Sequence, residues 1–292
     1  MHLIIFVWGF TGILGKLIRL DSYSIVWYRV FIAFISLWLV LAFLKKPMLI
    51  RNRKHLISTI AVGVIVACHW LAFYKAIQLS TVSLGVLCLS TTTLHVSWLE
   101  PLVMKRKFSW IEFLLGLLVI YGIYIVSEDF SANDIVAMLW GLSAAFLSAC
   151  FAVFNARLAK EGVSSSSITL YEMGTAVVFI TLLLLAQGKL TSSFFIMTWS
   201  DFYWLLFLGI ICTSCAFLLM IEVVKKIGAF SAALTINLEP VYTIILAIFI
   251  LGENQELSMK FYWGALMIIF VVFLNPLLRY WVEKRQSGKA VS

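Results

Sequence analysis

Residues 231–257 read SAALTINLEPVYTIILAIFILGENQEL, and most of them belong to an apolar run over residues 228–251. A helix that crosses the hydrocarbon core of a membrane takes about 20 residues, so this run is long enough to span one. Glu239 and Pro240 lie about halfway along it. An ionisable side chain is costly at that depth, and a proline frees a backbone carbonyl from its usual donor. The stretch therefore predicts a membrane helix with a functional group at its middle.

Other apolar runs of spanning length fill the rest of the chain. They cover residues 2–18, 22–44, 55–77, 80–103, 109–127, 134–156, 164–187, 200–224 and 257–280. Of the 292 residues, 63% are hydrophobic and 12% are charged, whereas soluble domains are about 45–50% apolar and about 25% charged. The composition excludes a soluble enzyme, a disordered chain and a coiled coil. It predicts an all-α polytopic membrane protein with ten transmembrane helices.

Lysine and arginine gather in alternate loops and in the C-terminal tail. The residues on this side are Lys45, Lys46, Arg51, Arg53, Lys54, Lys105, Arg106, Lys107, Arg157, Lys160, Lys225, Lys226, Arg279, Lys284, Arg285 and Lys289. The opposite loops hold Lys16, Arg19, Lys75, Lys189 and Lys260, together with Glu128, Asp129, Asp134, Glu253 and Glu256. Because basic loops stay on the cytoplasmic side, both termini are expected to be cytoplasmic. The basic residues form no face on a soluble scaffold, so a nucleic-acid partner is not expected.

The chain also contains an internal repeat. Residues 73–125 match residues 221–273 at a constant offset, which pairs Ser83 with Ser231, Gly116 with Gly264 and Lys105 with Glu253. Each repeat has five predicted helices, an odd number, so the second repeat must cross the membrane inverted. The repeats are expected over residues 1–130 and 131–285, with a short cytoplasmic tail over 286–292. Inverted repeats around a site near the midplane are common in secondary transporters.

An ordered set of motifs runs through both halves. It comprises Trp8-Gly9, Arg29, Ala76 with Ser83, the stretch from Asn237 to Pro240 and the stretch from Leu251 to Glu253. This set resembles the EamA family of the drug/metabolite transporter superfamily. The resemblance implies two inverted five-helix repeats and alternating-access transport of amino acids or related metabolites, often outward. One departure is Ser90-Thr91-Thr92, where the family commonly has a proline, so the break in that helix is expected to be weaker.

Two polar stripes related by the repeat are the first candidates for a substrate or coupling site. Ser231, Thr235, Glu239 and Thr243 are spaced on one helix face, which should point into the bundle because lipid cannot satisfy it. Thr91 and His95 are the repeat mates of Glu239 and Thr243, and Asn237 is a further candidate. His95 and Glu239 form a hypothetical proton-responsive pair, since histidine titrates near neutral pH. The alternatives are a helix-bracing carboxyl group and a packed histidine.

Several aromatic residues are candidates to contact a substrate. His69, Trp70 and Tyr74 lie in the outer half of the third predicted helix, where their rings can stack on an apolar or cationic substrate. Trp8 and Trp140 are repeat-related. Core packing or anchoring at the membrane interface is the competing explanation for all of them.

Two more charges are predicted within membrane helices. Arg29 lies about 10 Å from the outer side. It either binds a substrate carboxylate or, as the favoured interpretation, extends outward and pairs with Asp21. Glu172 lies at a comparable depth from the inner side, which suggests gating or structural charges of opposite sign.

Catalytic constellations and nucleotide-binding loops are not found in the sequence, and neither an enzyme nor a cofactor is predicted. The cysteines Cys68, Cys88, Cys150, Cys212 and Cys215 all lie in apolar runs, and the CxxC formed by the last two lacks polar ligands nearby, so no metal is expected. The sequence favours a secondary transporter, expected to be an exporter in a bacterial inner membrane, whose partners are a small-molecule substrate and membrane lipid. Protons are a further partner under coupling through Glu239 or His95, and uniport fits the same residues equally well. The alternatives are a polytopic membrane enzyme or flippase acting on lipid, and a channel.

Overall fold

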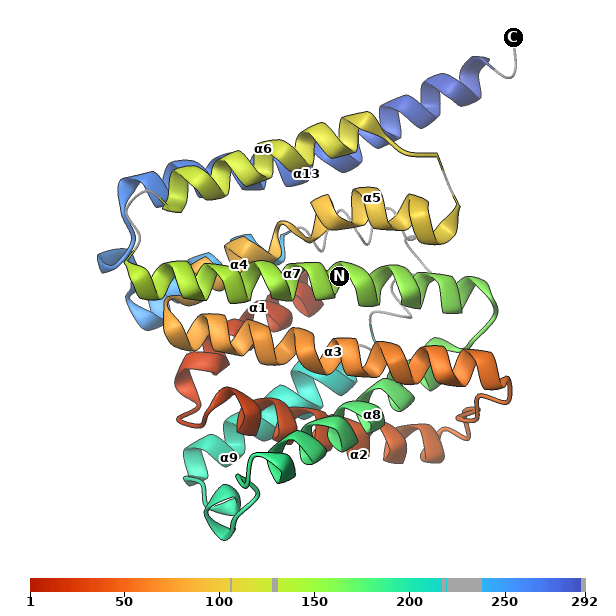
Figure 1. Ribbon diagram of the computed structural model, residues 1–292, viewed down its shortest axis with the longest axis vertical. Helices are drawn as coiled ribbons and strands as arrows, with labels where there is room; N and C mark the ends of the chain where they lie inside the picture. Colours follow the sequence, from red (N-terminus) through yellow and green to blue (C-terminus); the bar gives the residue numbers. More distant parts are fainter. Residues whose placement is uncertain (106, 128–130, 217–218, 220–237, 290–292) are drawn as a thin grey trace.

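The computed structural model of the chain describes residues 1–105, 107–127, 131–216, 219 and 238–289, and the described residues form helices and connecting loops (Figure 1). The elements are α1 (His2–Leu17), α2 (Ser22–Phe43), α3 (Arg53–Leu79), α4 (Val82–Leu89), α5 (Thr92–Met104), α6 (Trp110–Ser127), α7 (Ala132–Lys160), α8 (Ser165–Ala186), η1 (Ser192–Phe195), α9 (Trp199–Leu206), η2 (Phe207–Cys215), α12 (Glu239–Leu246), η3 (Ala247–Leu251), η4 (Glu253–Gln255) and α13 (Met259–Lys289).

The predicted all-helical membrane architecture is confirmed. By length and composition, five described segments are able to cross a membrane: Ser22–Phe43, Arg53–Leu79, Val82–Met104, Ala132–Lys160 and Ser165–Ala186. Shorter apolar helices cover His2–Leu17, Phe113–Val126, Trp199–Cys215, Glu239–Leu251 and Met259–Val271. Every predicted run overlaps one of these segments.

Several helices begin where a polar side chain accepts a hydrogen bond from the first turn. The Asp21 carboxylate accepts from the backbone N–H of Ser24 at 2.8 Å, and the Thr81 hydroxyl accepts from Leu84 at 3.1 Å. Ser131 and Asp134 form a reciprocal capping box at the start of α7. Such caps satisfy donors that have no partner inside the helix. Asp21 therefore has a structural function at the start of α2.

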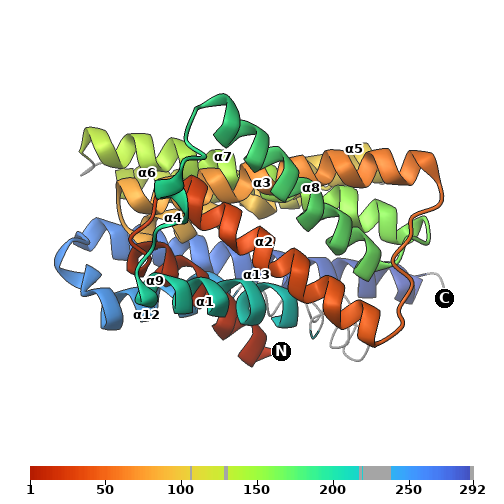
Figure 2. The same cartoon turned by 90° about the horizontal axis from the view of Figure 1, so that it is seen from below.

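Some of the helix contacts recur between the two halves, as a two-repeat fold would require. Helix α6 packs along α13, and the two lie side by side in Figure 1. Seen from below in Figure 2, α1, α9 and α12 lie on one side of the molecule, and α3, α6 and α7 lie on the other. The contact of α3 in the first half with α8 in the second corresponds to the contact of η2 with α2, and both are present. In the same way the contact of α1 with α12 corresponds to that of α7 with α4 and α5.

Alternate loops meet at opposite ends of the bundle. At one end the backbone N–H of Arg19 donates to Asp201 at 2.8 Å, and the Ser80 hydroxyl donates to Asp134. At the other end the Ser167 hydroxyl donates to the carbonyl of Pro47 at 3.0 Å, and His55 pairs with Glu161 at 3.1 Å. The helices therefore run from one end to the other, as successive membrane crossings require.

Glu253 lies inside the protein, although the sequence suggested a loop carboxylate. Only 3% of its surface is exposed, and it accepts hydrogen bonds from the backbone N–H groups of Val82 at 2.6 Å and Ser83 at 3.0 Å. It thus caps the start of α4 from the other half of the chain, where the helix dipole favours a negative charge. Its predicted repeat mate Lys105 is exposed at the far end of the same segment, Val82–Met104.

Replacing Glu253 with alanine is expected to destabilise the protein. The change leaves two buried N–H donors without their acceptor, at about 1–3 kcal/mol for each unsatisfied group. Thermal unfolding of the purified protein in detergent should show a clearly lower midpoint. The midpoint of Glu253→Gln, which keeps one acceptor oxygen, should lie between those of Glu253→Ala and the wild type. The midpoint of Glu256→Gln, a change at the exposed neighbouring carboxylate, should match the wild type. An unchanged midpoint for Glu253→Ala would contradict the capping role.

The segment from Val82 to Met104 is interrupted at Ser90 and Thr91, although its proline, Pro101, lies further along, inside α5. Helix α4 ends at Leu89 and α5 begins at Thr92. The Thr91 hydroxyl donates to the carbonyl of Cys88 at 2.7 Å, and Thr93 donates to that of Ser90 at 3.1 Å. Hydroxyl side chains therefore bond the backbone at the interruption, where the Cys88 carbonyl also accepts from the backbone N–H of Thr91 at 3.0 Å.

Candidate functional site

Arg29 is buried within the helix bundle. Only 4% of its surface is exposed. Its Nε donates to the Thr213 hydroxyl at 3.1 Å, and its Nη1 donates to the Tyr74 hydroxyl at 3.0 Å. The guanidinium also lies over the ring of Trp70, 4.1 Å from the centroid, in the geometry of a cation–π contact. The favoured pairing of Arg29 with Asp21 is therefore wrong, because the side chain turns inward to these three partners.

Two of the three partners of Arg29, Tyr74 and Thr213, are themselves held by hydrogen bonds. The Tyr74 hydroxyl donates to the backbone carbonyl of Thr11 at 3.4 Å. The Thr213 hydroxyl donates to the carbonyl of Leu208 at 2.8 Å, across the π-helical turn of η2. Single turns of π-helix are rare and occur frequently at functional sites. The Arg29 cluster, which we define as Arg29, Trp70, Tyr74 and Thr213, thus joins α2 and α3 of the first half to η2 of the second.

The strongest sequence candidate lies near this cluster. Glu239 is the first residue of α12, is half-buried and is followed by Pro240, a residue that suits the first turn of a helix. Its carboxylate and Arg29 interact electrostatically. An arginine of the first half and an acidic residue of the second half therefore lie in the same region. The candidates Thr235 and Asn237, and Ser231 of the same predicted stripe, lie outside the described residues.

The position of α12 depends on close contact with α1. The Thr243 hydroxyl donates to the backbone carbonyl of Glu239 at 2.9 Å, and Thr243 is buried. A Cβ atom at Gly9 would lie 3.1 Å from the Thr243 hydroxyl oxygen, so a larger residue there would displace α12. Gly9 of the Trp8-Gly9 motif therefore sets the approach of the helix that carries Glu239.

Thr91 and His95 line a cavity to which no residue of the Arg29 cluster contributes. This cavity, of about 610 Å³, lies between α5, α6 and α7 and is also lined by Ser143 and Phe146. The His95 ring meets the Phe146 ring edge-on, with centroids 5.5 Å apart. Among the described interactions, the charge that acts on Glu239 is that of Arg29. The structure therefore does not bring the hypothetical pair of His95 and Glu239 into contact.

His69 is a packed histidine between two helices. It is 7% exposed, and its Nδ1 donates to the carbonyl of Ala144 in α7 at 2.8 Å. Phe151 meets its ring edge-on at 5.3 Å, and Phe73 stacks on it at 6.4 Å. This environment matches the core-packing explanation and fixes α3 against α7.

The two repeat-related tryptophans lie away from the cluster. Trp8 is half-buried and packs near Ile4 and Ala216. Trp140 is 43% exposed, and the cavity beside α7 is lined by its neighbour Leu139 instead. Packing or contact with the membrane accounts for these positions better than contact with a substrate.

Glu172 belongs to the packing of α8 against α3 and α7. It is 3% exposed, and its Oε1 atom and the Oδ1 atom of Asn155 in α7 are both buried without a hydrogen-bond partner among the described residues. A Cβ atom at Gly63 of α3 would lie 3.0 Å from the Glu172 backbone, so only glycine permits this approach. The predicted opposition of Glu172 to Arg29 is absent from the described contacts, in which Arg29 meets the three partners given above.

Thr213 is the residue that the sequence interpretation missed. It lies in Cys212-Thr213-Ser214-Cys215, a stretch that was interpreted from its two cysteines and not from the two hydroxyl residues between them. Cys212 is buried, as expected for a small hydrophobic residue. The available signal was a pair of hydroxyl residues within an apolar run, since both hydroxyls need hydrogen-bond partners there.

Comparisons with known proteins bear on both the family and the fold. A family model described as the EamA-like transporter family matches residues 1–128 and 135–276. A solved structure titled "Crystal structure of protein" has 13% sequence identity and a TM-score of 0.67, and the alignment covers 96% of this chain and 96% of that chain. At this identity the likeness shows the fold alone. No curated protein matches the chain.

Proposed function

Since the chain belongs to the EamA-like transporter family and is a membrane transporter of that type, we propose that it carries small zwitterionic metabolites. Amino acids and related compounds are the substrate class, and export across a bacterial inner membrane is the direction. The family consists of transporters, so an enzyme acting on lipid is the weaker alternative.

The observation that carries this proposal is the buried Arg29 cluster at the meeting of the two halves. A guanidinium presents paired N–H groups that match a carboxylate, and two described hydrogen bonds use two of its five N–H groups. Glu239 supplies the opposite charge that a substrate ammonium requires. The faces of Trp70 and Tyr74 add contact for an apolar or cationic side chain.

The proposed architecture is ten transmembrane helices in two inverted repeats, residues 1–130 and 131–285, with the 286–292 tail and both termini in the cytoplasm. The recurring helix contacts support it, as do the positions of Lys105 and Glu253 at opposite ends of one segment. In such folds alternating access proceeds by movement of one repeat against the other around a central site. We propose that the Arg29 cluster and Glu239 form that site.

Transport by purified protein in liposomes tests the proposal. A panel of amino acids is compared with the same compounds amidated at the carboxyl group or acetylated at the amine. Both modifications are expected to abolish flux, because each removes one of the two charges. Equal flux of the modified compounds would contradict recognition of a zwitterion. Movement of fluorescent phospholipid between leaflets would favour the flippase alternative.

The energy source is tested in the same liposomes with and without a pH gradient. Proton coupling through Glu239 predicts substrate accumulation that depends on the gradient, whereas a uniporter only equilibrates its substrate. Glu239 is the candidate for coupling because it combines an exchangeable proton with the charge of Arg29 nearby.

Thr213→Val is expected to weaken substrate binding about tenfold. The change removes one hydrogen bond to the Arg29 guanidinium, and hydrogen bonds to charged groups contribute about 1.5–3 kcal/mol. The concentration dependence of uptake measures this effect. Thr213→Ser keeps the hydroxyl and should match the wild type, so equal behaviour of the two variants would argue against a role for this contact.

A further inference from the structure

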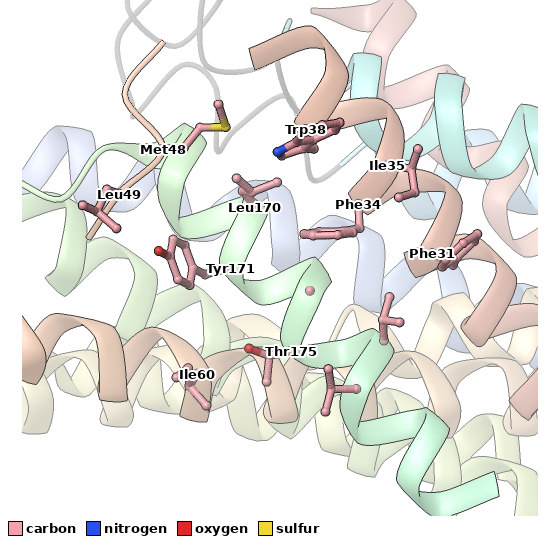
Figure 3. A pocket seen from close by; sticks show the side chains of 13 residues that line it. Phe31, Phe34, Ile35, Trp38, Met48, Leu49, Ile60, Leu170, Tyr171 and Thr175 are labelled. Atoms are coloured by element: carbon pink, nitrogen blue, oxygen red, sulfur yellow. The ribbon is translucent and has the colours of Figure 1, made fainter. Parts of the chain in front are cut away.

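An apolar groove opens on the side of the bundle, between α2, α3 and α8, as Figure 3 shows. Its volume is about 720 Å³. Residues from all three helices and from the loop after α2 line it, among them Phe34, Trp38, Met48, Ile60, Leu170 and Tyr171. The lining shares no residue with the Arg29 cluster, so the groove is a separate feature.

The groove walls are exposed at the surface of the described part of the protein. Trp38 of α2 is 48% exposed, and Val178 of α8 is 59% exposed. Apolar side chains exposed on a membrane helix face acyl chains. Because the walls are apolar and come from three helices, a single acyl chain can lie in the groove and contact side chains of α2, α3 and α8.

The loop that closes one end of the groove is strongly basic. Met48 and Leu49 line the groove, while Lys46 and Arg51 lie two residues to either side of them and are exposed. Lys45, Arg53 and Lys54 lie in or beside the same loop, and residues 43–56 contain no acidic residue. The Ser167 hydroxyl holds this loop to α8 through the Pro47 carbonyl at 3.0 Å. The apolar groove thus ends beside a loop that carries a cluster of exposed positive charges.

We propose that this groove is a specific binding site for an anionic phospholipid. One acyl chain lies between α2 and α8, and the phosphate group lies against the basic loop. Both features are needed: apolar contact retains any lipid, and the charges select an anionic headgroup. Each lysine or arginine near an anionic surface contributes roughly a fivefold preference. The site rests on the membrane location of the family and does not depend on the proposed substrate.

Quenching of Trp38 by brominated acyl chains tests this site. The protein is placed in phosphatidylcholine vesicles that contain brominated phosphatidylglycerol or, in a matched series, brominated phosphatidylcholine. The Trp38→Phe variant isolates the Trp38 signal from the other ten of the 11 tryptophans. Brominated phosphatidylglycerol is expected to quench Trp38 at a mole fraction at least about twenty-fivefold lower than brominated phosphatidylcholine, from roughly fivefold for each of two basic residues.

Two pairs of variants test the headgroup and the chain separately. Lys46→Gln with Arg51→Gln should reduce the anionic preference about twentyfold, whereas Lys105→Gln with Lys107→Gln, exposed charges of another loop, should leave it unchanged. Val178→Phe should fill the groove and reduce quenching. Leu182→Phe, one turn further along α8 and 60% exposed, should not.

Three outcomes would overturn the site. Equal quenching by both lipids would show contact with bulk lipid only. An absence of quenching by either lipid would show that a second copy of the chain or another segment covers the groove. Insensitivity to the change of Lys46 and Arg51 would remove the headgroup interaction. None of these results affects the transport assay, so the lipid site and the proposed function can fail independently.

Discussion

Replacing Arg29 with lysine is expected to reduce substrate flux more than a hundredfold in a protein that still folds. Lysine keeps the positive charge, but an ammonium cannot reproduce the planar fork that donates to Thr213 and Tyr74 and receives a carboxylate. Two hydrogen bonds to a charged group contribute about 3–6 kcal/mol together, which corresponds to at least a hundredfold change. The initial rate of uptake into proteoliposomes measures the effect.

The control for Arg29→Lys is Arg19→Lys. Arg19 is exposed near the start of the same helix, and only its backbone is bonded to Asp201. That variant should transport at the wild-type rate. Thermal unfolding of both variants separates loss of function from loss of structure. Flux within threefold of the wild type in a folded Arg29→Lys protein would remove Arg29 from the substrate site.

Replacing Glu239 with glutamine is expected to abolish accumulation driven by a pH gradient. Glutamine has nearly the same shape but carries neither a negative charge nor an exchangeable proton. Exchange of substrate at equal pH should persist at about a tenth of the wild-type rate, since the rest of the site is intact. Uptake with and without the gradient, in the same vesicles, measures both quantities.

His95→Gln is the comparison for Glu239→Gln. His95 lies in the cavity between α5, α6 and α7, so its change should alter flux and pH dependence less than twofold. The opposite result, with coupling lost in His95→Gln and kept in Glu239→Gln, would move the coupling site to that cavity. Loss in both variants would require a path that links the two regions.

Helix positions could be predicted from the sequence because lipid allows few alternatives. A backbone in the hydrocarbon core must satisfy its own hydrogen bonds, so a long apolar run becomes a helix whatever its neighbours are. The run over residues 22–44 accordingly matches α2 within one residue at its end. The break near Thr91 was expected to be weak for want of a proline. It is nevertheless present, and the hydroxyl groups of Thr91 and Thr93 donate to backbone carbonyls beside it.

The partners of charged residues could not be predicted in the same way. Asp21 was a candidate partner for Arg29 because it is close in sequence. Its carboxylate instead caps α2 by accepting a hydrogen bond from the backbone N–H of Ser24. Thr213 is 184 residues from Arg29 in the sequence and reaches it only through the π-helical turn of η2. Glu253 lies 171 residues from Val82. Such contacts depend on helix packing, which hydropathy does not encode.

The two ends of the bundle are closed with unequal strength. At the end that carries Glu253, buried hydrogen bonds to a charged group cross between the halves, each at about 1.5–3 kcal/mol. At the basic end the halves are joined by the hydrogen bond from Ser167 to the Pro47 carbonyl, at about 0.5–1.5 kcal/mol, and by the partly exposed ion pair of His55 with Glu161, at about 0–1 kcal/mol. For a carrier that opens its ends in turn, the basic end therefore requires the smaller free energy to open. The unloaded protein is expected to rest with its site accessible from the basic side.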